Sequence, residues 1–512
     1  GVFGQYLYRR NASERAIEGE TGRDPRPGES KQYNLGAKLM LTPNKDHDIW
    51  LDAEQGRTWY DNSDCRLGTI DYLDCATGGT TTRLSGYQDY LRFNRDQISL
   101  GYTSRFAWGQ VESSLMRNAT ETEGRTVVYT ASPRHGQWRK LESVNLVADT
   151  KAVMPVGEKH VLTAGGQWWD AEVEDGMLPE EDYSQSMWAL FLEDEWKFAR
   201  DWTMTLGGRY NRHDEFDGKF TPRAYLVWQT TPEWTVKGGV SQGYKAPTVT
   251  QLITGINSVG GQGSNPGIGN PNLKPELSTN SELGLLYADQ KGLSGSATVF
   301  HNKIKDKIRS SGRCNVVWIA GCDAQGATAS ESYNINIDEA KTYGLEFAGS
   351  IPLADRWSIS LGYTWTDTEV KEDGIKSGKL SNTPKHMGNA RLNWETTDKM
   401  NLWLQANYRG KSRRFDNPYS AMSDDEKAEY DAVGDLKAYT LFNLGGSYKY
   451  DKRVTFHANI YNLLNKDFND YASWIDEEGN TQVSSRYYQG GQSIKGTALP
   501  GRTFWISANV TF

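Results

Sequence analysis

The sequence predicts an all-β protein, a large transmembrane antiparallel β-barrel, and three observations lead to this prediction. The final segment, residues 501–512, alternates between a small or polar face and an apolar face that carries Phe504, Ile506 and Val510. A period of two is that of a β-strand whose faces meet different surroundings. No run approaches the roughly 18 apolar residues that a membrane-spanning helix needs. The whole chain, finally, is too polar to supply a soluble core of matching size.

Composition explains why a barrel fits better than a soluble domain. Hydrophobic residues are 37% of the 512 residues, mean hydropathy is −0.69, and aromatic residues reach 12%. A barrel interior can stay hydrated, so only the outward half of each strand must be apolar. The net charge of −8 and the pI of about 5.6 argue against nucleic acid as a partner.

About twenty segments show the alternation expected of strands. They lie at residues 3–10, 31–43, 49–60, 90–105, 109–118, 138–155, 160–172, 186–199, 202–211, 219–230, 234–245, 279–288, 293–306, 333–350, 357–365, 384–396, 402–409, 442–450, 454–463 and 503–512. Short polar turns such as 44–48 alternate with long polar loops such as 61–89. Outer-membrane barrels show this asymmetry, with short turns on the periplasmic side and long loops outside.

The clearest pleats lie in the middle of the chain. Trp202, Leu206 and Tyr210 fall on one face, while Thr205 and Arg209 fall on the other. The second face is too polar for the core of a sandwich. Aromatic residues gather toward strand ends, where the headgroups of a membrane would lie.

Four cysteines form two pairs that are each close in sequence and set in a long polar stretch. They are Cys65 with Cys75 and Cys314 with Cys322. The pairing favours two disulfide-closed loops in an oxidising compartment, and four unrelated thiols are the alternative. Neither pair has the short spacing of zinc ligands, so no metal site is expected.

Several motifs resemble those of TonB-dependent outer-membrane receptors. They are residues 241–252 (Ser-Gln-Gly-Tyr-Lys-Ala-Pro-Thr-Val-Thr-Gln-Leu), 270–276 (Asn-Pro-Asn-Leu-Lys-Pro-Glu), 282–284 (Glu-Leu-Gly), 340–347 (Ala-Lys-Thr-Tyr-Gly-Leu-Glu-Phe), 461–467 (Tyr-Asn-Leu-Leu-Asn-Lys-Asp) and the aromatic-ended final strand. The resemblance covers essentially the whole chain. It is greatest to the catecholate-siderophore branch, which includes the colicin I receptor and the ferric enterobactin receptor.

The resemblance implies a bacterial outer-membrane location and import of a ferric siderophore. Receptors of this family have 22 strands around an N-terminal plug, and the plug carries the TonB box. Residues 1–512 resemble the barrel alone, with the plug and the first two strands missing. Implied partners are the ferric siderophore, the TonB–ExbB–ExbD complex through the plug, lipopolysaccharide and outer-membrane lipid, and bacteriocin or phage. Iron would be present only within the ligand, with no resident cofactor.

Read from the residues alone, the motifs are interpreted as a structural rim that folds a long loop back onto the barrel, and contact with a ligand is the less favoured alternative. Tyr244–Pro247 ends a strand, because proline cannot donate to the ladder. Asn270–Pro271 and Lys274–Pro275 are turn dipeptides that lead to the next strand. The glycine-rich run at 260–269 is interpreted as a flexible loop. Ser423–Glu426 resembles a capping box and predicts a short loop helix.

Ligand binding is expected from cationic and aromatic residues in the long loops, if the ligand is an anionic, flat-ringed ferric catecholate. The candidates are Arg134, Trp138, Arg139, Arg313, Trp318, Arg413, Arg414, Phe415, Tyr419, Arg486, Tyr487 and Tyr488. For each of them the alternative is a solvated side chain or one that faces lipopolysaccharide.

Other functions are considered beside this one. The seven His are scattered and form no HExxH, nucleophile elbow or triad grouping, so no enzyme is predicted. Haem receptors of the family place a His between motifs like those at 244–247 and 270–273, and this chain has none there. Cobalamin and hydroxamate siderophores remain open. A passive channel and a structural adhesin or bacteriocin receptor are the competing classes.

Overall fold

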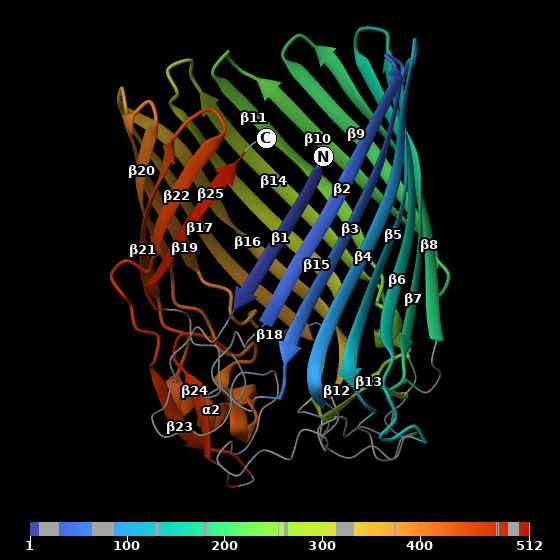
Figure 1. The fold of residues 1–512 in the computed structure, drawn as a ribbon, viewed down its shortest axis with the longest axis vertical. Coiled ribbons are helices and arrows are strands. Elements are labelled where there is room, and N and C mark those ends of the chain that lie inside the picture. Colours follow the sequence, from blue (N-terminus) through green and yellow to red (C-terminus); the bar gives the residue numbers. More distant parts are fainter. Residues whose placement is uncertain are drawn as a thin grey trace.

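The wall of the protein is one antiparallel sheet rolled into a barrel (Figure 1). The computed structural model describes residues 1–9, 30–63, 87–127, 133–178, 182–253, 255–260, 265–313, 332–372, 375–477, 479, 481–489 and 501–510. Within these residues the sheet has 23 strands, of which β12 (Gly255–Gly260), β13 (Asn265–Gly269) and β18 (Ile375–Gly378) belong to loops and the other twenty form the wall. The wall strands are β1 (Val2–Arg9), β2 (Ser30–Asn44), β3 (His47–Asp61), β4 (Tyr87–Phe106), β5 (Gly109–Arg125), β6 (Leu141–Val156), β7 (His160–Asp175), β8 (Asp182–Ala199), β9 (Trp202–His213), β10 (Lys219–Gln229), β11 (Trp234–Lys245), β14 (Glu276–Ala288), β15 (Ser294–Arg313), β16 (Ser332–Ala354), β17 (Trp357–Glu372), β19 (His386–Thr397), β20 (Met400–Arg409), β21 (Tyr439–Lys449), β22 (Val454–Tyr461) and β25 (Thr503–Val510).

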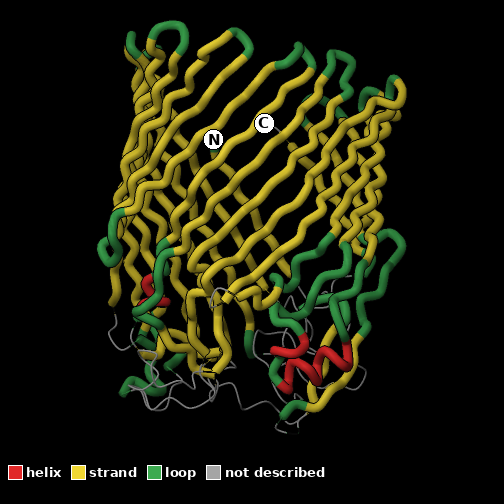
Figure 2. The backbone as a smooth tube through the Cα atoms, turned by 180° about the vertical axis from the view of Figure 1, so that it is seen from behind, coloured by secondary structure: helices red, strands yellow, loops and turns green. Residues whose placement is uncertain are grey.

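Each wall strand pairs with the next wall strand along the chain, from β1–β2 to β22–β25. The described registers include no pair between β1 and β25. The two mouths of the barrel differ. Consecutive strands are joined by short turns at the upper mouth in Figure 1, for example 45–46, 107–108 and 200–201, and by long loops at the lower mouth (Figures 1 and 2). The predicted asymmetry of turns and loops is confirmed.

The outward face of the wall carries an apolar belt. In β9 and β10 the registers put Leu206 beside Ala224 and Met204 beside Leu226, with Leu206 47% exposed on a face that has no protein opposite it. Stacked tryptophans border the belt at the turn side, with ring centroids 4.7 Å apart for Trp202 and Trp228. Tyr210 stands eight residues further along β9, about 26 Å along the strand. At a tilt of about 40° this spacing is a rise of about 20 Å along the barrel axis, somewhat less than the band of about 25 Å that faces lipid in outer-membrane barrels.

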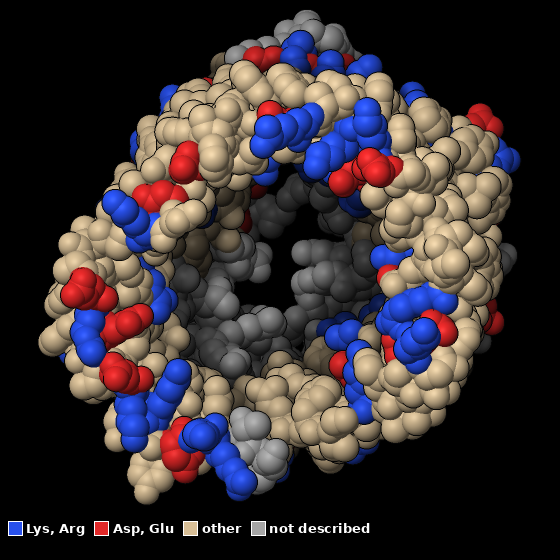
Figure 3. All heavy atoms as spheres, turned by 90° about the horizontal axis from the view of Figure 1, so that it is seen from above, with Lys and Arg blue, Asp and Glu red and all other residues tan. Residues whose placement is uncertain are grey.

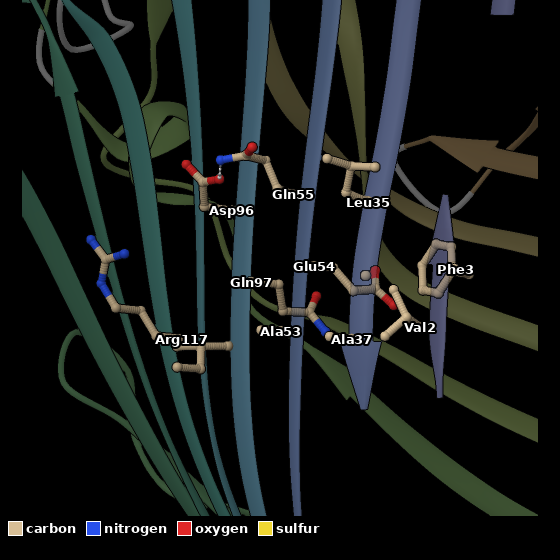
Figure 4. Close-up of a pocket in the computed structure, with 12 residues that line it drawn as sticks. Val2, Phe3, Leu35, Ala37, Ala53, Glu54, Gln55, Asp96, Gln97 and Arg117 are labelled. Atoms are coloured by element: carbon tan, nitrogen blue, oxygen red, sulfur yellow. Dashed lines mark hydrogen bonds between the residues drawn. The ribbon is translucent and has the colours of Figure 1, made fainter. Parts of the chain in front are cut away.

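On the loop side of the belt, the outward face turns polar. Figure 4 shows this boundary in a shallow hollow over β1 to β5, where Val2 and Ala53 give way to Gln55 and Asp96. The amide of Gln55 donates to Asp96 at 3.2 Å, and Arg57 reaches the same carboxylate at 2.9 Å. The strands therefore extend beyond the membrane into the aqueous layer outside it.

This extension explains why some strands run further than the sequence predicted. β5 runs to Arg125 and β15 to Arg313, whereas the sequence predicted ends at 118 and 306. Beyond the belt both faces of a strand meet water, so the alternation that marks a strand disappears there. The hydrogen-bonded ladder continues nevertheless.

The inner face carries many charged and amide side chains, with aromatic rings among them. Arg209 donates to Gln167 at 2.7 Å, and Lys151 lies 3.0 Å from Glu112. The guanidinium of Arg391 lies 4.3 Å from the ring centre of Trp403. Seen along the barrel axis, the described residues form a ring with an open centre (Figure 3). The wall thus separates lipid from a hydrated lumen, as predicted.

Tightly packed apolar clusters lie in the loops rather than in the wall. Leu178, Val249 and Ile253 are each less than 9% exposed and pack together, where the short helix α1 (Val249–Leu252) meets the β7–β8 connection. A second cluster joins Ile337, Ala340 and Val370. Among the described helices, none has the length and apolar character needed to cross a membrane.

The described part of the glycine-rich run, residues 260 and 265–269, is not the flexible loop that was predicted. Residues 255–260 form β12 (Gly255–Gly260) and residues 265–269 form β13 (Asn265–Gly269), which pair with each other. Ile268 is buried, and a Cβ at Gly269 would lie 2.0 Å from the carbonyl oxygen of Ile253. Glycine is needed here because two backbones approach closely, and a strand ladder uses only backbone groups.

Candidate functional site

The long loops at one mouth of the barrel form a compact subdomain that we call the cap. It consists of residues 410–437, 462–477 and 481–489, and contains the 3₁₀ turn η3 (Tyr419–Ala421), α2 (Asp424–Val433), β23 (Tyr471–Ile475) and β24 (Thr481–Ser485) (Figure 1). Ser423 caps α2 with the predicted capping box, accepting from the backbone N–H of Glu426 at 3.1 Å. The predicted loop helix is therefore confirmed. The separate hairpin of β23 and β24 packs against it.

Arg414 ties the cap together from its centre. Its side chain is 1% exposed and donates to the carbonyl of Gly434 at 2.8 Å, to Glu429 at 3.0 Å and to the carbonyl of Ser485 at 2.5 Å. Burial lowers the pKa of the guanidinium, and Glu429 opposes that shift. With its donors committed to protein acceptors, Arg414 holds the cap in shape. In this structure its guanidinium presents no surface to a ligand, contrary to the role expected for it.

Arg486 forms an ion-pair network on the side of the cap. It lies 3.3 Å from Asp470 and donates to the carbonyl of Ala432 at 3.2 Å, while Lys437 lies 2.6 Å from the same aspartate. The hydrogen bond from Lys437, together with the charge of both cations, holds the pKa of Asp470 below its ordinary value of 3.8. Two cations share one carboxylate here, so the group carries a net positive charge. The side chain of Arg486 is about a third exposed.

Aromatic rings pack beside this network. The hydroxyl of Tyr487 accepts a hydrogen bond from Lys466 at 2.7 Å, and its ring meets Phe468 edge to face with centroids 5.2 Å apart. Tyr488 shares a hydroxyl–hydroxyl hydrogen bond with Tyr471. Burial, followed by this bond, raises the pKa of Tyr471, and burial raises that of Tyr488. Tyr471 and Tyr488 therefore stay neutral, whereas the ring of Tyr487 is buried within the cap.

The remaining cap candidates are more accessible. Arg413 donates to the carbonyl of Asn417 at 3.2 Å, and Phe415 is half-buried beside it. Tyr419 is 47% exposed, and its hydroxyl donates to Asp431 at 3.1 Å. The cap thus brings together seven predicted binding residues, although the first and the last of them are 75 positions apart in the sequence.

A second group of candidates lies in the β5–β6 loop. Arg139 makes a bidentate pair with Asp175, with distances of 2.7 and 2.6 Å and both side chains less than a tenth exposed. Arg134 donates to the carbonyl of Leu178. Trp138 is 63% exposed. Arg139 is therefore a structural partner of Asp175 in this structure, whereas the ring of Trp138 stands open to solvent.

Some predicted residues lie beyond what the structure describes. The backbone of Arg313 ends β15, and its side chain falls outside the description, as does all of Trp318. The four cysteines, Cys65, Cys75, Cys314 and Cys322, also lie outside the described residues, so the disulfides stay a prediction. Within the described part of the chain, no group of three or more His, Cys, Asp or Glu is arranged to hold a metal ion.

Sequence reasoning missed four residues of the cap network: Lys437, Lys466, Asp470 and Tyr471. One signal was available. Lys466 belongs to the motif at 461–467 and follows Asn462, whose side chain bonds to both the N–H and the carbonyl of Lys466 at 2.7 and 2.9 Å. That turn aims the lysine toward Tyr487.

The motifs between β11 and β14 join loops to the wall. β11 ends at Lys245, as predicted. The side chain of Asn270 donates to the carbonyl of Asn334 at 3.0 Å. Asn336 accepts from the N–H of Lys274 at 2.8 Å and donates to the carbonyls of Lys274 and Asp306 at 2.9 and 2.6 Å. These hydrogen bonds agree with the interpretation of this motif as structural.

These features define a class: a large outer-membrane β-barrel with folded loops at one mouth. The sequence model of the family described as "TonB dependent receptor-like, beta-barrel" matches residues 4–463, and the chain belongs to this family. It is 37% identical over 356 residues to the Iron-regulated outer membrane virulence protein of Vibrio cholerae serotype O1, covering 69% of this chain and 52% of that protein. It is 29% identical over 402 residues to the Ferric enterobactin receptor of Pseudomonas aeruginosa, covering 72% and 51%. The chain thus spans about half the length of these relatives.

Solved structures share the fold. A ferric enterobactin receptor (PfeA) variant from Pseudomonas aeruginosa, in complex with enterobactin, matches with a TM-score of 0.74 and 22% identity, covering 100% of this chain and 76% of that one. The siderophore receptor PirA from Acinetobacter baumannii matches with a TM-score of 0.73 and 18% identity, covering 100% and 75%. At these identities the likeness concerns the fold alone.

Proposed function

We propose that this chain is the barrel of an outer-membrane receptor that imports a ferric siderophore of the catecholate type in a TonB-dependent manner. The observation that carries the proposal is the cap, where the partly exposed cations Lys437 and Arg486 share Asp470, Tyr419 is exposed and Tyr488 is half-buried. Tyr487 is 9% exposed and packs inside the cap. Cations balance the negative charge of a ferric catecholate, and aromatic rings offer faces for its flat catechols.

The names of the relatives support this choice of ligand. One curated relative is a ferric enterobactin receptor, and one structural neighbour was solved with enterobactin. In this proposal iron enters only inside the ligand, and the chain carries no cofactor of its own. Energy comes from the TonB–ExbB–ExbD complex acting on a plug domain inside the wall. The protein is a transporter rather than an enzyme.

Among the predicted residues, the accessible ones are the best ligand contacts. Trp138 and Tyr419 are 63% and 47% exposed. Arg486 is about a third exposed and is paired with Asp470. Arg139 and Arg414 hold the loops in place, so their contribution to binding is to position other residues.

Binding of ferric enterobactin to the full-length receptor tests the ligand class. Quenching of intrinsic tryptophan fluorescence is the readout, and the open ring of Trp138 is a suitable reporter. We expect saturable quenching by ferric enterobactin, and none by haem, cobalamin or a ferric hydroxamate. Tight binding of one of those three, with no response to ferric enterobactin, would keep the family and discard the catecholate.

A matched pair of variants separates charge from structure at the cap. Arg486→Ala removes a cation, whereas Asp470→Asn breaks the same ion pair and leaves the cation in place. If Arg486 binds the ligand through its charge, only Arg486→Ala weakens affinity for ferric enterobactin. Equal losses in both variants would show that Arg486 matters only for the shape of the cap.

A passive channel is the alternative, because the described wall encloses an open lumen (Figure 3). Single-channel recording of the full-length receptor in planar bilayers distinguishes the two functions. A gated importer stays closed without TonB, whereas a steady large conductance would favour the channel.

A further inference from the structure

The cap is joined to the wall on the lumen side of β21. On this strand Asn443 pairs with the lumen-facing Gln405, and Tyr439 lies four residues earlier on the same face. The ring of Tyr439 meets those of Phe468 and Tyr487 edge to face, with centroids 5.0 and 6.1 Å apart. Phe468 and Tyr487 are only 2% and 9% exposed. The three rings therefore form a buried contact between one wall strand and the cap.

Asn462 fixes the turn beside this contact. Its backbone N–H donates to the side chain of Asn443 at 2.9 Å, and its own side chain bonds both the N–H and the carbonyl of Lys466. The residue is 4% exposed and has a φ of 51°, in the left-handed region that asparagine adopts more readily than most residues. Asn462 thus binds the wall through its backbone and shapes the turn through its side chain.

That turn holds the segment with the predicted ligand contacts at two points. The ammonium of Lys466 donates to the hydroxyl of Tyr487 at 2.7 Å. The carbonyl of Asp470 accepts from the backbone N–H of Arg486 at 2.9 Å. The placement of Arg486 relative to the lumen is therefore set by the turn, and the placement of the turn is set by Asn462.

The role of Asn462 differs from that of Arg414. The side chain of Arg414 bonds to Glu429 and to two carbonyl groups that all belong to the cap, so it holds parts of the cap to one another. The bonds of Asn462 run from the wall to the cap. Losing Asn462 should therefore change where the cap stands and leave its interior intact.

We propose that Asn462 is a positioning residue for the ferric siderophore, which places Arg486 and Tyr488 by fixing the turn at 462–470 to β21. At 4% exposure, Asn462 does not contact the ligand itself and acts through Lys466 and Asp470. The inference rests on the proposed function, because the groups that Asn462 places are the ones proposed to contact the siderophore.

Hydrogen exchange of the full-length receptor without ligand tests the placement alone. Asn462→Gly removes the side chain, and glycine accepts the left-handed backbone without strain. We expect faster exchange at residues 486–488 with α2 unchanged. Asn465→Gly is the matched control, because Asn465 has a φ of 52° in the same turn but accepts from the N–H of Arg502, next to β25. Unchanged exchange at 486–488 in Asn462→Gly would overturn the inference, as would equal acceleration in α2 or in the control.

A double-mutant cycle on ferric enterobactin affinity, read by tryptophan quenching, tests the consequence for binding. We expect Arg486→Ala to weaken binding about tenfold, as the loss of one charged hydrogen bond does. Asn462→Gly should have a similar effect. If it acts through Arg486, the double variant is also weakened about tenfold, whereas independent losses would multiply to about a hundredfold and contradict the inference.

The two measurements fail separately. If Arg486→Ala binds ferric enterobactin as tightly as the parent, Arg486 is not a ligand contact and that part of the proposed function fails. Hydrogen exchange then decides alone whether Asn462 places the cap. If Arg486→Ala weakens binding and Asn462→Gly does not, Arg486 stays a ligand contact and the positioning role of Asn462 is refuted.

Discussion

The guanidinium of Arg414 donates to the carbonyl oxygen of Ser485 at 2.5 Å, across 71 residues of chain. This bond joins the loop after β20 to the hairpin of β23 and β24. Together with the bonds to Glu429 and Gly434, it makes one buried side chain the common partner of three segments.

Arg414→Ala should therefore loosen the cap and leave the wall intact. Glu429 and two carbonyl groups lose their donors, and each unsatisfied group costs about 1–3 kcal/mol. Hydrogen exchange should show faster exchange in α2, β23 and β24, with β20 and β21 unchanged. Arg413→Ala, which removes a single bond to Asn417, is the matched control and should have a much smaller effect. Equal effects of the two variants would contradict the central role of Arg414.

The ion pairs of Asp470 should make the cap sensitive to acid. Its pKa is depressed by Lys437 and Arg486, so the stabilisation it contributes is fully present above its ordinary pKa of 3.8. That stabilisation is lost as the pH falls through the lower pKa of the folded state. At neutral pH, Asp470→Asn should exchange faster than the parent in β23 and β24. Well below pH 3.8 the two proteins should become alike. A difference that persists there would show that the carboxylate charge is not the cause.

Asn336→Ala should detach the β11–β14 loop from the β15–β16 hairpin. The side chain serves three backbone groups of Lys274 and Asp306, and losing it costs about 1–3 kcal/mol. Limited proteolysis should then cut within 246–275. Asn334→Ala is a close control. Asn270 donates its hydrogen bond to the backbone carbonyl of Asn334, and this carbonyl is still present in the variant. Cleavage in the control at the same rate would sink the argument.

Two adjacent residues of β20 should differ in how much a positive charge destabilises the protein. Leu404 faces the lipid side at 41% exposure, while Gln405 faces the lumen and donates to Asn407 at 2.8 Å. Leu404→Arg should lower the free energy of unfolding by about 2–4 kcal/mol, as charges do at the middle of the belt. Gln405→Arg should change it by less than about 1 kcal/mol. Denaturant titration in lipid bilayers measures both, and similar losses would mean that the assigned faces are wrong.

The wall was largely predictable because two solvents impose its pattern. In β20, Leu402 and Leu404 must meet lipid, while Trp403 and Gln405 meet the lumen. The alternation of residue types along the sequence therefore specifies the register of the strand. All of the expected segments coincide with wall strands, from β1 to β25. Where both faces meet water, as near Arg125, the pattern fades and predicted ends fall short.

The cap was not predictable in the same way. The helix α2 was predictable from Ser423, because a capping box is a local sequence signal. The partnership of Arg414 with Ser485 has no periodicity and spans loops far apart in the chain. From the sequence, Arg414 and Arg486 are equivalent cations beside aromatic residues. Only packing shows that one is buried and the other a third exposed.

The order of the strand registers sets the route by which the protein assembles. Every wall strand pairs with its successor, so each new pairing joins neighbours in the chain and can add to the growing edge of the sheet. The cap joins 410–437 to 462–489, and its bonds need β21 and β22 already in place between them. We expect pulse-labelled hydrogen exchange to protect the wall first and α2 with β23 and β24 last. The mouth of the barrel is thus completed only after the wall that supports it.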